Sequence, residues 1–304
     1  MRGLWVVSTA LALLIGLAGC SDGSEPPAPK SEANQPAPAG RVLDRSADLT
    51  ALEQAHDVRL GVFALDTGSG DTLEHRADER FAFASTVKAF LVGALLEQES
   101  PAVLQQEVPI SPADLVAHAP AVEEALAQGR TTMTVAELAD GAVRFSDNAA
   151  ANLLLQLVGG PAGLQAALRA SGDDVTNATR TEPALNEAVP GDDRDTSTPR
   201  AMAGTLQHYA LDGADPSTRD VLLDLMRRNT TGDALVRAGV PAEWEVADKT
   251  GSAAYGTRND IAVVWPPQRE PIVVVIMTSR DEQDADTVDP AIAAAMTLVA
   301  EALS

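Results

Sequence analysis

The sequence predicts a two-lobed α+β protein, in which an antiparallel sheet flanked by helices joins an all-helical lobe. Residues 59–65, the turn at 66–71 and the apolar residues after it have the composition of a strand hairpin. Residues 83–225 are rich in alanine and leucine and carry repeated helix signals, and two Val/Ile runs return near the C-terminus. Because strands come from both chain ends, we expect one sheet, with a cleft between it and the helical middle of the chain.

Local start and stop signals predict the helices. Residues 46–56 follow the amphipathic pattern of a helix that precedes the first strand. Thr134 and Glu137, three positions apart, form a capping-box pattern, and Thr198-Pro199 places a cap before a proline at the first helical position. Gly159-Gly160 is expected to end a further helix.

The C-terminal part of the chain predicts two buried strands and a closing helix. Residues 261–265 and 272–278 are nearly unbroken in valine and isoleucine, which is typical of strands covered on both faces. Residues 290–303 then form an apolar helix. These elements complete the sheet that the N-terminal hairpin begins.

Bulk composition excludes several classes of partner. The chain has 304 residues, 45% of them hydrophobic, and a net charge of −22, which disfavours nucleic acid and anionic lipid surfaces. Its four histidines are not spaced like metal ligands, and its single cysteine rules out an intrachain disulfide and a cysteine-based zinc cluster. We expect no metal and no cofactor, and a monomer.

The N-terminus predicts export. Arg2 precedes an apolar run at residues 4–17, and Leu17-Ala18-Gly19-Cys20 resembles the bacterial lipoprotein box. This resemblance implies a signal peptide of residues 1–19 and lipid attachment to Cys20, at the extracytoplasmic face of the membrane. The alternative is an ordinary secretory signal with an incidental cysteine, and a soluble released form. The Pro/Ala/Ser-rich residues 20–40 are expected to be a flexible linker, and residues 41–304 the folded domain, with its helical lobe at about 82–225.

The folded part contains only two lysines, Lys88 and Lys249, because Lys30 lies in the linker. All other positive side chains there are arginines, which keep their proton at usable pH, whereas a buried lysine can lose it and act as a base. Both lysines lie in short motifs with serine or threonine, and this pattern indicates an enzyme that uses a serine nucleophile for acyl transfer.

Three motifs contain the candidate site residues. Ser85 and Lys88 are three positions apart, so in a helix over residues 83–91 the amine would lie beside the hydroxyl. On its own this pattern equally fits a helix start with an exposed lysine. Ser146-Asp147-Asn148 separates two predicted helices, and Lys249-Thr250-Gly251 is expected on an edge strand, where Gly251 lets a ligand approach the backbone.

The order and spacing of these motifs resemble class A β-lactamases and penicillin-binding proteins. Arg180-Thr181-Glu182-Pro183-Ala184-Leu185-Asn186 resembles the loop with which class A β-lactamases hold a hydrolytic water, and Arg194-Asp195 matches its end. The resemblance implies that Arg180 and Asp195 pair across the loop. Together with further matches it covers residues 41–304 and implies the serine β-lactamase/DD-peptidase fold. Those further matches are Asn229-Thr230-Thr231-Gly232, Ala238-Gly239-Val240-Pro241 and Tyr255-Gly256-Thr257-Arg258-Asn259-Asp260.

The resemblance also implies a mechanism for acylation. Ser85 attacks the lactam carbonyl, and the N–H groups of Ser85 and Ser252 form the oxyanion hole. The acylation base is either neutral Lys88 or Glu182 acting through a water, and the sequence leaves both open. Ser146 passes a proton to the leaving nitrogen, helped by Lys249.

Deacylation and substrate binding follow from the same resemblance. Glu182 and its partner Asn186 position the water that hydrolyses the acyl-enzyme. Asn148 holds the acyl-amide side chain of the substrate. The substrate carboxylate is bound by Lys249, Thr250, Ser252 and Arg258, with the alternative that Arg258 is a surface arginine. Gly251 belongs to the substrate-binding residues because its bare backbone lets the ligand approach.

His118 takes the position at which the family commonly has an aromatic gatekeeper, and an ordinary surface histidine is the alternative. The absence of cysteine from the domain argues against the carbapenem-hydrolysing relatives that carry a disulfide. Penicillins are the expected substrates. Ser252 beside Thr250 resembles enzymes that also accept cephalosporins, which implies this second class of substrate.

Two rival functions share part of this pattern. A penicillin-binding transpeptidase or carboxypeptidase would have the serine and lysine motifs without the Glu182 loop. A non-catalytic surface lipoprotein would need neither a nucleophile nor a water-activating carboxylate. The sequence therefore favours a serine β-lactamase (EC 3.5.2.6) as the hydrolase.

Overall fold

The computed structural model describes residues 40–304. The predicted signal peptide, the lipid attachment at Cys20 and nearly all of the linker lie outside the described residues. The described residues all belong to one unit of the chain, and both predicted lobes fall within it.

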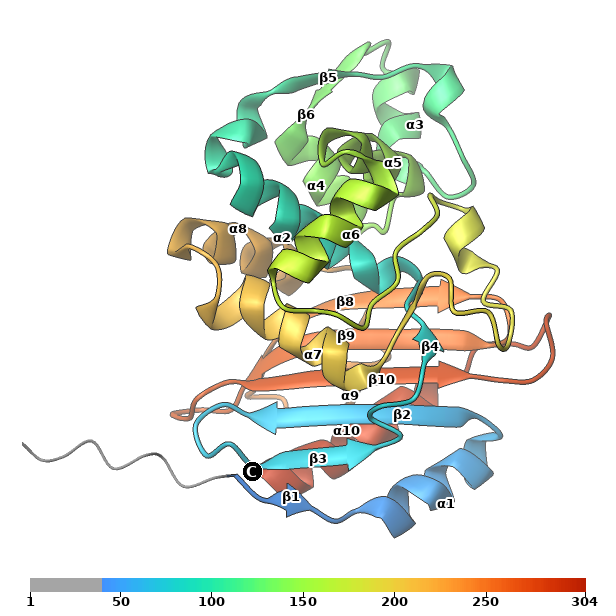
Figure 1. Ribbon diagram of the computed structural model, residues 1–304, viewed down its shortest axis with the longest axis vertical. Helices are drawn as coiled ribbons and strands as arrows, with labels where there is room; N and C mark the ends of the chain where they lie inside the picture. The colour runs from blue at the N-terminus through green and yellow to red at the C-terminus, as the bar shows by residue number, and fades with distance from the viewer. Residues whose placement is uncertain (1–39) are drawn as a thin grey trace, which may run out of the picture. The chain divides into compact units, whose positions relative to one another are not determined.

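A six-stranded sheet with the order β1-β3-β2-β10-β9-β8 joins the two ends of the chain, as predicted (Figure 1). Neighbouring strands are antiparallel, as predicted, except that the short strand β1 pairs in parallel with β3 at the edge of the sheet. The strands are β1 Val42–Leu43, β2 Arg59–Asp66, β3 Thr72–His75, β8 Glu245–Ala253, β9 Thr257–Trp265 and β10 Ile272–Ser279.

Strand β10 is central and buried on both faces, as its Val/Ile run predicted. Val273, Val275 and Met277 pack into the core shared with the helical lobe, whereas Val274 and Ile276 pack into the core on the opposite face. Successive side chains of a strand point to opposite faces, so an uninterrupted apolar run can serve two cores.

The face of the sheet away from the helical lobe is covered by α1 Ser46–His56, α9 Val236–Gly239 and α10 Asp289–Leu303. Helix α1 matches its predicted bounds, and α10 begins one residue before the predicted start. Both terminal helices lie together at the lower end of the molecule in Figure 1.

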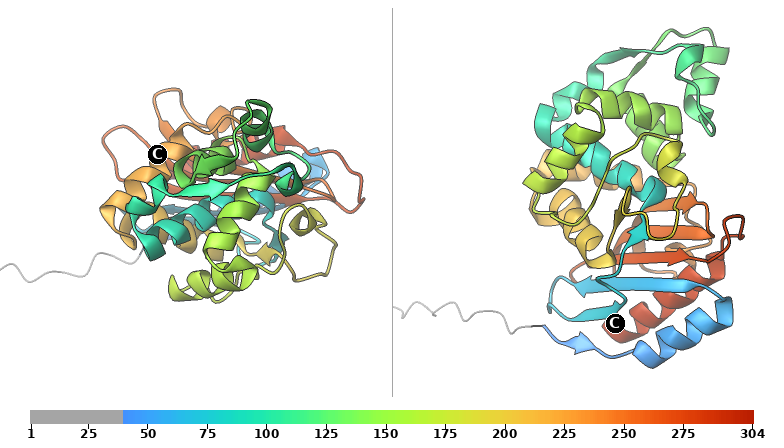
Figure 2. Two further views of the ribbon diagram at one scale, coloured as in Figure 1. Left: turned by 90° about the horizontal axis from the view of Figure 1, so that it is seen from above. Right: turned by 45° about the vertical axis from the view of Figure 1, so that its right-hand side comes forward.

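Seven helices form the second lobe on the other face of the sheet, and most of them stand above it in Figure 1 and in the right-hand view of Figure 2. They are α2 Val87–Glu99, α3 Pro120–Ala127, α4 Val135–Arg144, α5 Asn148–Leu157, α6 Gly160–Ala170, α7 Pro199–Gln207 and α8 Pro216–Arg227.

The predicted capping box at the start of α4 is confirmed. Thr134 Oγ1 accepts from Glu137 N at 3.2 Å, and Glu137 Oε2 accepts from Thr134 N at 2.8 Å.

Two short strand pairs interrupt the segment that was predicted to be mostly helical. β4 Phe81–Ala82 pairs with β7 Thr196–Ser197, and β5 Glu107–Pro109 pairs with β6 Thr132–Thr134. Each has only two or three residues and joins positions far apart in sequence, so a local periodicity cannot reveal it.

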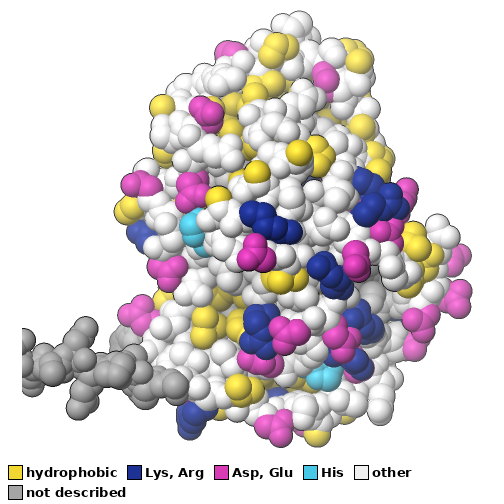
Figure 3. All heavy atoms as spheres, in the orientation of Figure 1, with side chains coloured by type: hydrophobic (Ala, Val, Ile, Leu, Met, Phe, Trp, Pro, Cys, Tyr) yellow, Lys and Arg dark blue, Asp and Glu magenta, His cyan; other side chains and the backbone are white. Residues whose placement is uncertain are grey.

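The surface carries paired charges of both signs, which Figure 3 shows for one face. Lys88 and Lys249 are both buried, so every exposed cation of the described domain is an arginine or a histidine. Within residues 40–304 no helix combines the length and the apolar character needed to cross a membrane.

Candidate active site

Ser85 and Lys88, the residues of the first predicted motif, both contact the same carboxylate oxygen of Glu182. Ser85 lies in the 3-10 turn η1 Ala84–Thr86, and α2 begins only at Val87, so the expectation of a helix from residue 83 is wrong for its first turn. Ala84 has a φ of 49°, in the left-handed region that a regular helix cannot contain. Ser85 Oγ nevertheless lies 3.3 Å from Glu182 Oε1, and Lys88 Nζ lies 3.0 Å from the same oxygen.

Lys88 is almost completely buried, and its side-chain nitrogen contacts three polar acceptors. Its Nζ donates to Ser146 O at 2.7 Å and to Asn148 Oδ1 at 2.5 Å, in addition to the Glu182 contact. Burial lowers the pKa of Lys88, while the Glu182 carboxylate opposes this shift. The amine therefore loses its proton more readily than an exposed lysine does.

Ser146 stands between the two lysines. Its Oγ accepts from Lys249 Nζ at 3.1 Å and lies 3.5 Å from Lys88 Nζ. The residue has a φ of 57°, a strained value for a serine, and the bond from Lys88 to its carbonyl helps to hold it. A hydroxyl between two amines can pass a proton in either direction.

Glu182 belongs to a loop that closes as predicted. The Arg180 guanidinium pairs with Asp195 Oδ2, and Asp195 Oδ1 accepts from the backbone N–H groups of Thr179 at 2.8 Å and Arg180 at 3.0 Å. Asn186 Nδ2 donates to Glu182 Oε2, as the resemblance implied.

Sequence reasoning missed Asn152, which fastens this loop to α5. Its Nδ2 donates to Glu182 O at 2.9 Å, and its Oδ1 accepts from Glu182 N at 3.0 Å. Asn152 comes four residues after Asn148 on a helix that is otherwise mostly alanine and leucine, and this shared face was the signal that could have identified it.

Asp147 was quoted in its motif but given no role. It caps α5 by accepting from Ala150 N at 2.8 Å, and its other oxygen accepts from Ala121 N at 2.8 Å. An aspartate just before a helix is a strong cap signal. The same carboxylate thus ties α3 to the segment that carries Ser146 and Asn148.

Asn148 has both ends of its amide in use, with Oδ1 bound by Lys88 and Nδ2 donating to Ala117 O at 2.8 Å. His118, next to that carbonyl, is exposed, has a φ of 61° and places Nε2 3.0 Å from Phe145 O. It therefore lies beside the Ser146 segment.

The Lys249 motif lies on the edge strand β8, as predicted. A Cβ on Gly251 would lie 3.0 Å from Phe83 O and 3.1 Å from Ala84 Cβ, so the bare backbone lets β8 pack against η1. Arg258 on β9 donates to Ser252 Oγ on the neighbouring strand β8 at 2.8 Å, and it forms an ion pair with Asp289 at 2.8 Å.

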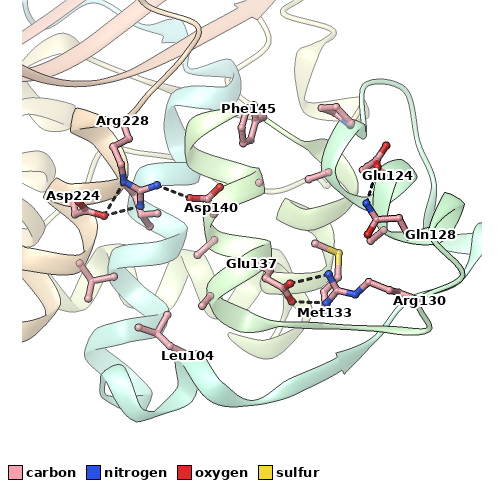
Figure 4. Close-up of a pocket in the computed structure, with 18 of the residues that line it drawn as sticks. Leu104, Glu124, Gln128, Arg130, Met133, Glu137, Asp140, Phe145, Asp224 and Arg228 are labelled. Carbon is pink, nitrogen blue, oxygen red and sulfur yellow. Dashed lines mark hydrogen bonds and ion pairs between the residues drawn. The ribbon is translucent and has the colours of Figure 1, made fainter.

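A separate cavity of about 930 Å³ lies in the helical lobe between α3, α4 and α8 (Figure 4). Its arginines are already paired, Arg130 with Glu137 at 2.7 Å and Arg228 with Asp224 at 2.6 Å. None of the predicted site residues lines it. Over the described part of the chain, no group of three or more His, Cys, Asp or Glu side chains is arranged to hold a metal ion.

Burial, together with the nearby Lys88 ammonium, lowers the pKa of Lys249 to about 7, although nearby carboxylates oppose this shift. In the unfolded chain the amine keeps its proton up to its ordinary value of 10.5. Between these values the unfolded state binds more protons, so this group makes the protein more stable as pH rises, by at most about 1.4 kcal/mol per pH unit. We expect Lys249→Met to reduce the rise in the free energy of unfolding between pH 7 and 9, measured by urea titration. An unchanged rise would show that Lys249 keeps its ordinary pKa.

Comparison with known proteins agrees with this geometry. Residues 44–303 match the family model described as Beta-lactamase enzyme family. The chain is 49% identical to a β-lactamase of Bacillus licheniformis, over 95% of this chain and 92% of that one. It is 52% identical to one of Amycolatopsis lactamdurans, over 88% and 89%. The crystal structure of a class A β-lactamase from Clostridium kluyveri is similar with a TM-score of 0.81 and 42% identity, covering 84% of this chain and 97% of that one.

The range matched by the family model, residues 44–303, includes the Ser85, Ser146, Glu182 and Lys249 segments. A penicillin-binding transpeptidase is correspondingly not favoured. With the buried serine–lysine–glutamate arrangement and this family match together, the chain belongs to the β-lactamase enzyme family, as a class A member whose activity is hydrolysis of the β-lactam ring.

Proposed function

We propose that Ser85 is the nucleophile of this hydrolysis and that Glu182 directs the water that releases the product. The observation that carries the proposal is that Ser85 Oγ and Lys88 Nζ both contact Glu182 Oε1 in a buried setting, at 3.3 and 3.0 Å. Nucleophile and two candidate bases thus share one hydrogen-bonded cluster.

In acylation, the Ser85 hydroxyl proton goes to Lys88 or, through a water, to Glu182. The lowered pKa of Lys88 supports the first route, and the contact of Ser85 with Glu182 supports the second. The tetrahedral oxygen binds to the N–H groups of Ser85 and Ser252, and the close packing of Gly251 against η1 supports this pairing. Ser146 then delivers a proton to the lactam nitrogen, and Lys249 returns one to Ser146.

In deacylation, Glu182 takes a proton from a water that attacks the acyl-enzyme. Asn186 Oδ1 is buried and has no partner among the described residues, so it can accept a hydrogen bond from that water. Asn186 Nδ2 at the same time holds the Glu182 carboxylate, and Asn152 holds its backbone.

The substrate carboxylate is bound at the end of β8 by Lys249, Thr250, Ser252 and Arg258, and Asn148 binds the acyl-amide side chain. Arg258 donates to Ser252 Oγ, which supports a common anion site, and Asp289 holds the guanidinium in place. We propose penicillins and cephalosporins as the substrates.

Steady-state hydrolysis of benzylpenicillin and a chromogenic cephalosporin by purified residues 41–304 tests this function. We expect many turnovers per enzyme, insensitive to a chelator and without added metal. A single stoichiometric burst followed by a stable acyl-enzyme would contradict the proposal and indicate a penicillin-binding protein.

We further propose that the protein is exported and anchored to the membrane through a lipid on Cys20. The signal-like run before this sole cysteine supports the proposal. The intact mass of membrane-extracted protein checks it, since a chain that begins at Cys20 without added lipid mass would contradict the anchor.

A further inference from the structure

Behind the edge strand β8, a chain of polar side chains runs away from Thr250. Thr250 Oγ1 lies 2.6 Å from Thr231 Oγ1, and Thr231 Oγ1 donates to Asn229 Oδ1 at 2.9 Å. Asn229 Nδ2 in turn donates to Asp248 Oδ2 at 2.6 Å, and Arg237 Nε donates to Asp248 Oδ1 at 2.7 Å. We call this series the hydroxyl relay; it connects Thr250, a predicted ligand of the substrate carboxylate, to the ion pair of the buried Asp248 with Arg237.

The donors of the relay can be assigned from proton counts. Arg237 and Asp248 fix the amide of Asn229 with its NH₂ toward Asp248, so Oδ1 faces Thr231 as an acceptor. The single hydroxyl proton of Thr231 is used on Asn229 Oδ1, and the proton between the two threonines therefore belongs to Thr250. In this arrangement the Thr250 proton points inward.

A substrate carboxylate needs that proton to point outward. If Thr250 turns its O–H toward the carboxylate, the Thr231 O–H can turn to Thr250 Oγ1 and replace the lost bond. Asn229 Oδ1 still accepts from Thr231 N at 3.2 Å, so no buried acceptor is left unpaired. The relay therefore reverses with little cost, and each hydroxyl polarises the next.

The surroundings hold the relay in position. Asn229, Asp248 and Thr250 are buried, and a Cβ on Gly232 would lie 2.0 Å from Asp248 Oδ2, so this glycine lets the connection after Asn229 close over the carboxylate. Thr231 is only half-buried, and its hydroxyl makes no other hydrogen bond among the described residues. Its hydroxyl contacts no predicted catalytic group.

We propose that Thr231 is a positioning residue that orients the Thr250 hydroxyl for recognition of the substrate carboxylate. The proposal rests on the proposed role of Thr250 in binding that carboxylate. Its direct consequence is selectivity: Thr231 acts on β-lactams that carry the free carboxylate and not on analogues in which this group is neutral.

The test compares benzylpenicillin with its carboxylate methyl ester. We expect Thr231→Val, which replaces the hydroxyl by a methyl group, to lower kcat/KM about fivefold for benzylpenicillin and to leave the ester unchanged. Thr231→Ser retains the hydroxyl and should restore the parent value. Thr230→Val is the matched control, because Thr230 donates to Arg144 O outside the relay.

An equal loss with both substrates, or no loss with either, would overturn the relay and leave Thr231 a structural residue. Thr231→Ala gives the same comparison if the valine variant does not fold. Thr250→Val separates this inference from the function beneath it. If Thr250→Val weakens only the carboxylate substrate while Thr231→Val does not, the relay alone is wrong. If Thr250→Val does not distinguish the two substrates, the proposed carboxylate contact fails as well.

Discussion

Replacing Ser85 with alanine is expected to lower kcat for benzylpenicillin by at least about 10⁴-fold. The hydroxyl is the atom that would form the acyl bond, and neither Lys88 nor Glu182 can replace it, because both are positioned to move protons. Steady-state hydrolysis together with intact mass spectrometry measures the effect, and no covalent adduct should appear.

The variant should remain folded, since Ser85 makes one long hydrogen bond and alanine removes only that oxygen. Ser46→Ala is the matched control, because Ser46 is an exposed serine on α1 and should keep the parent rate. Hydrolysis by Ser85→Ala above about one-hundredth of the parent rate would mean that another group is the nucleophile.

Replacing Glu182 with alanine is expected to slow deacylation by about 10²–10⁴-fold while acylation continues. Lys88 loses the carboxylate that raises its pKa, so its amine loses its proton more readily and remains a base for Ser85. Mixed with benzylpenicillin, the variant should show a fast burst of one equivalent and a persistent mass increase of one penicillin.

Glu187→Ala is the control for this prediction, because Glu187 pairs with Arg180 in the same loop but is exposed. It should turn over near the parent rate. If Glu182→Ala hydrolyses a good penicillin as fast as the parent, Glu182 does not activate the water. If instead the burst is lost, Glu182 is also the acylation base.

Local patterns accounted for most of the sheet and the helices. The capping box at Thr134 and the Val/Ile run of β10 each depend on residues a few positions apart, and both were predicted from the sequence. β1 has two residues and pairs with a distant segment, so its pairing could not be predicted. The 3-10 turn at Ser85 was missed because the left-handed φ of Ala84 has no signature in the sequence.

The candidate site likewise has residues that the sequence predicted and residues that only the structure identified. The short motifs and the family resemblance together predicted Ser85, Lys88, Ser146, Glu182 and Lys249 as site residues. Asn152 was not predicted, because it has no motif of its own and acts through a contact with a distant segment. Thr231 was quoted only within a matching segment, and its contact with Thr250 is seen only in the structure.

The sequence by itself predicted the order of the main strands and helices and, through family resemblance, the proposed reacting side chains and the pairing of Arg180 with Asp195. Tertiary structure alone decided which of these side chains touch. Ser85 and Glu182 are 97 positions apart, and Ser146 and Lys249 are 103 apart, yet each pair shares a hydrogen bond. The lowered pKa values of both lysines arise in the same way, because burial between the sheet and the helical lobe removes the water that would otherwise solvate the charge.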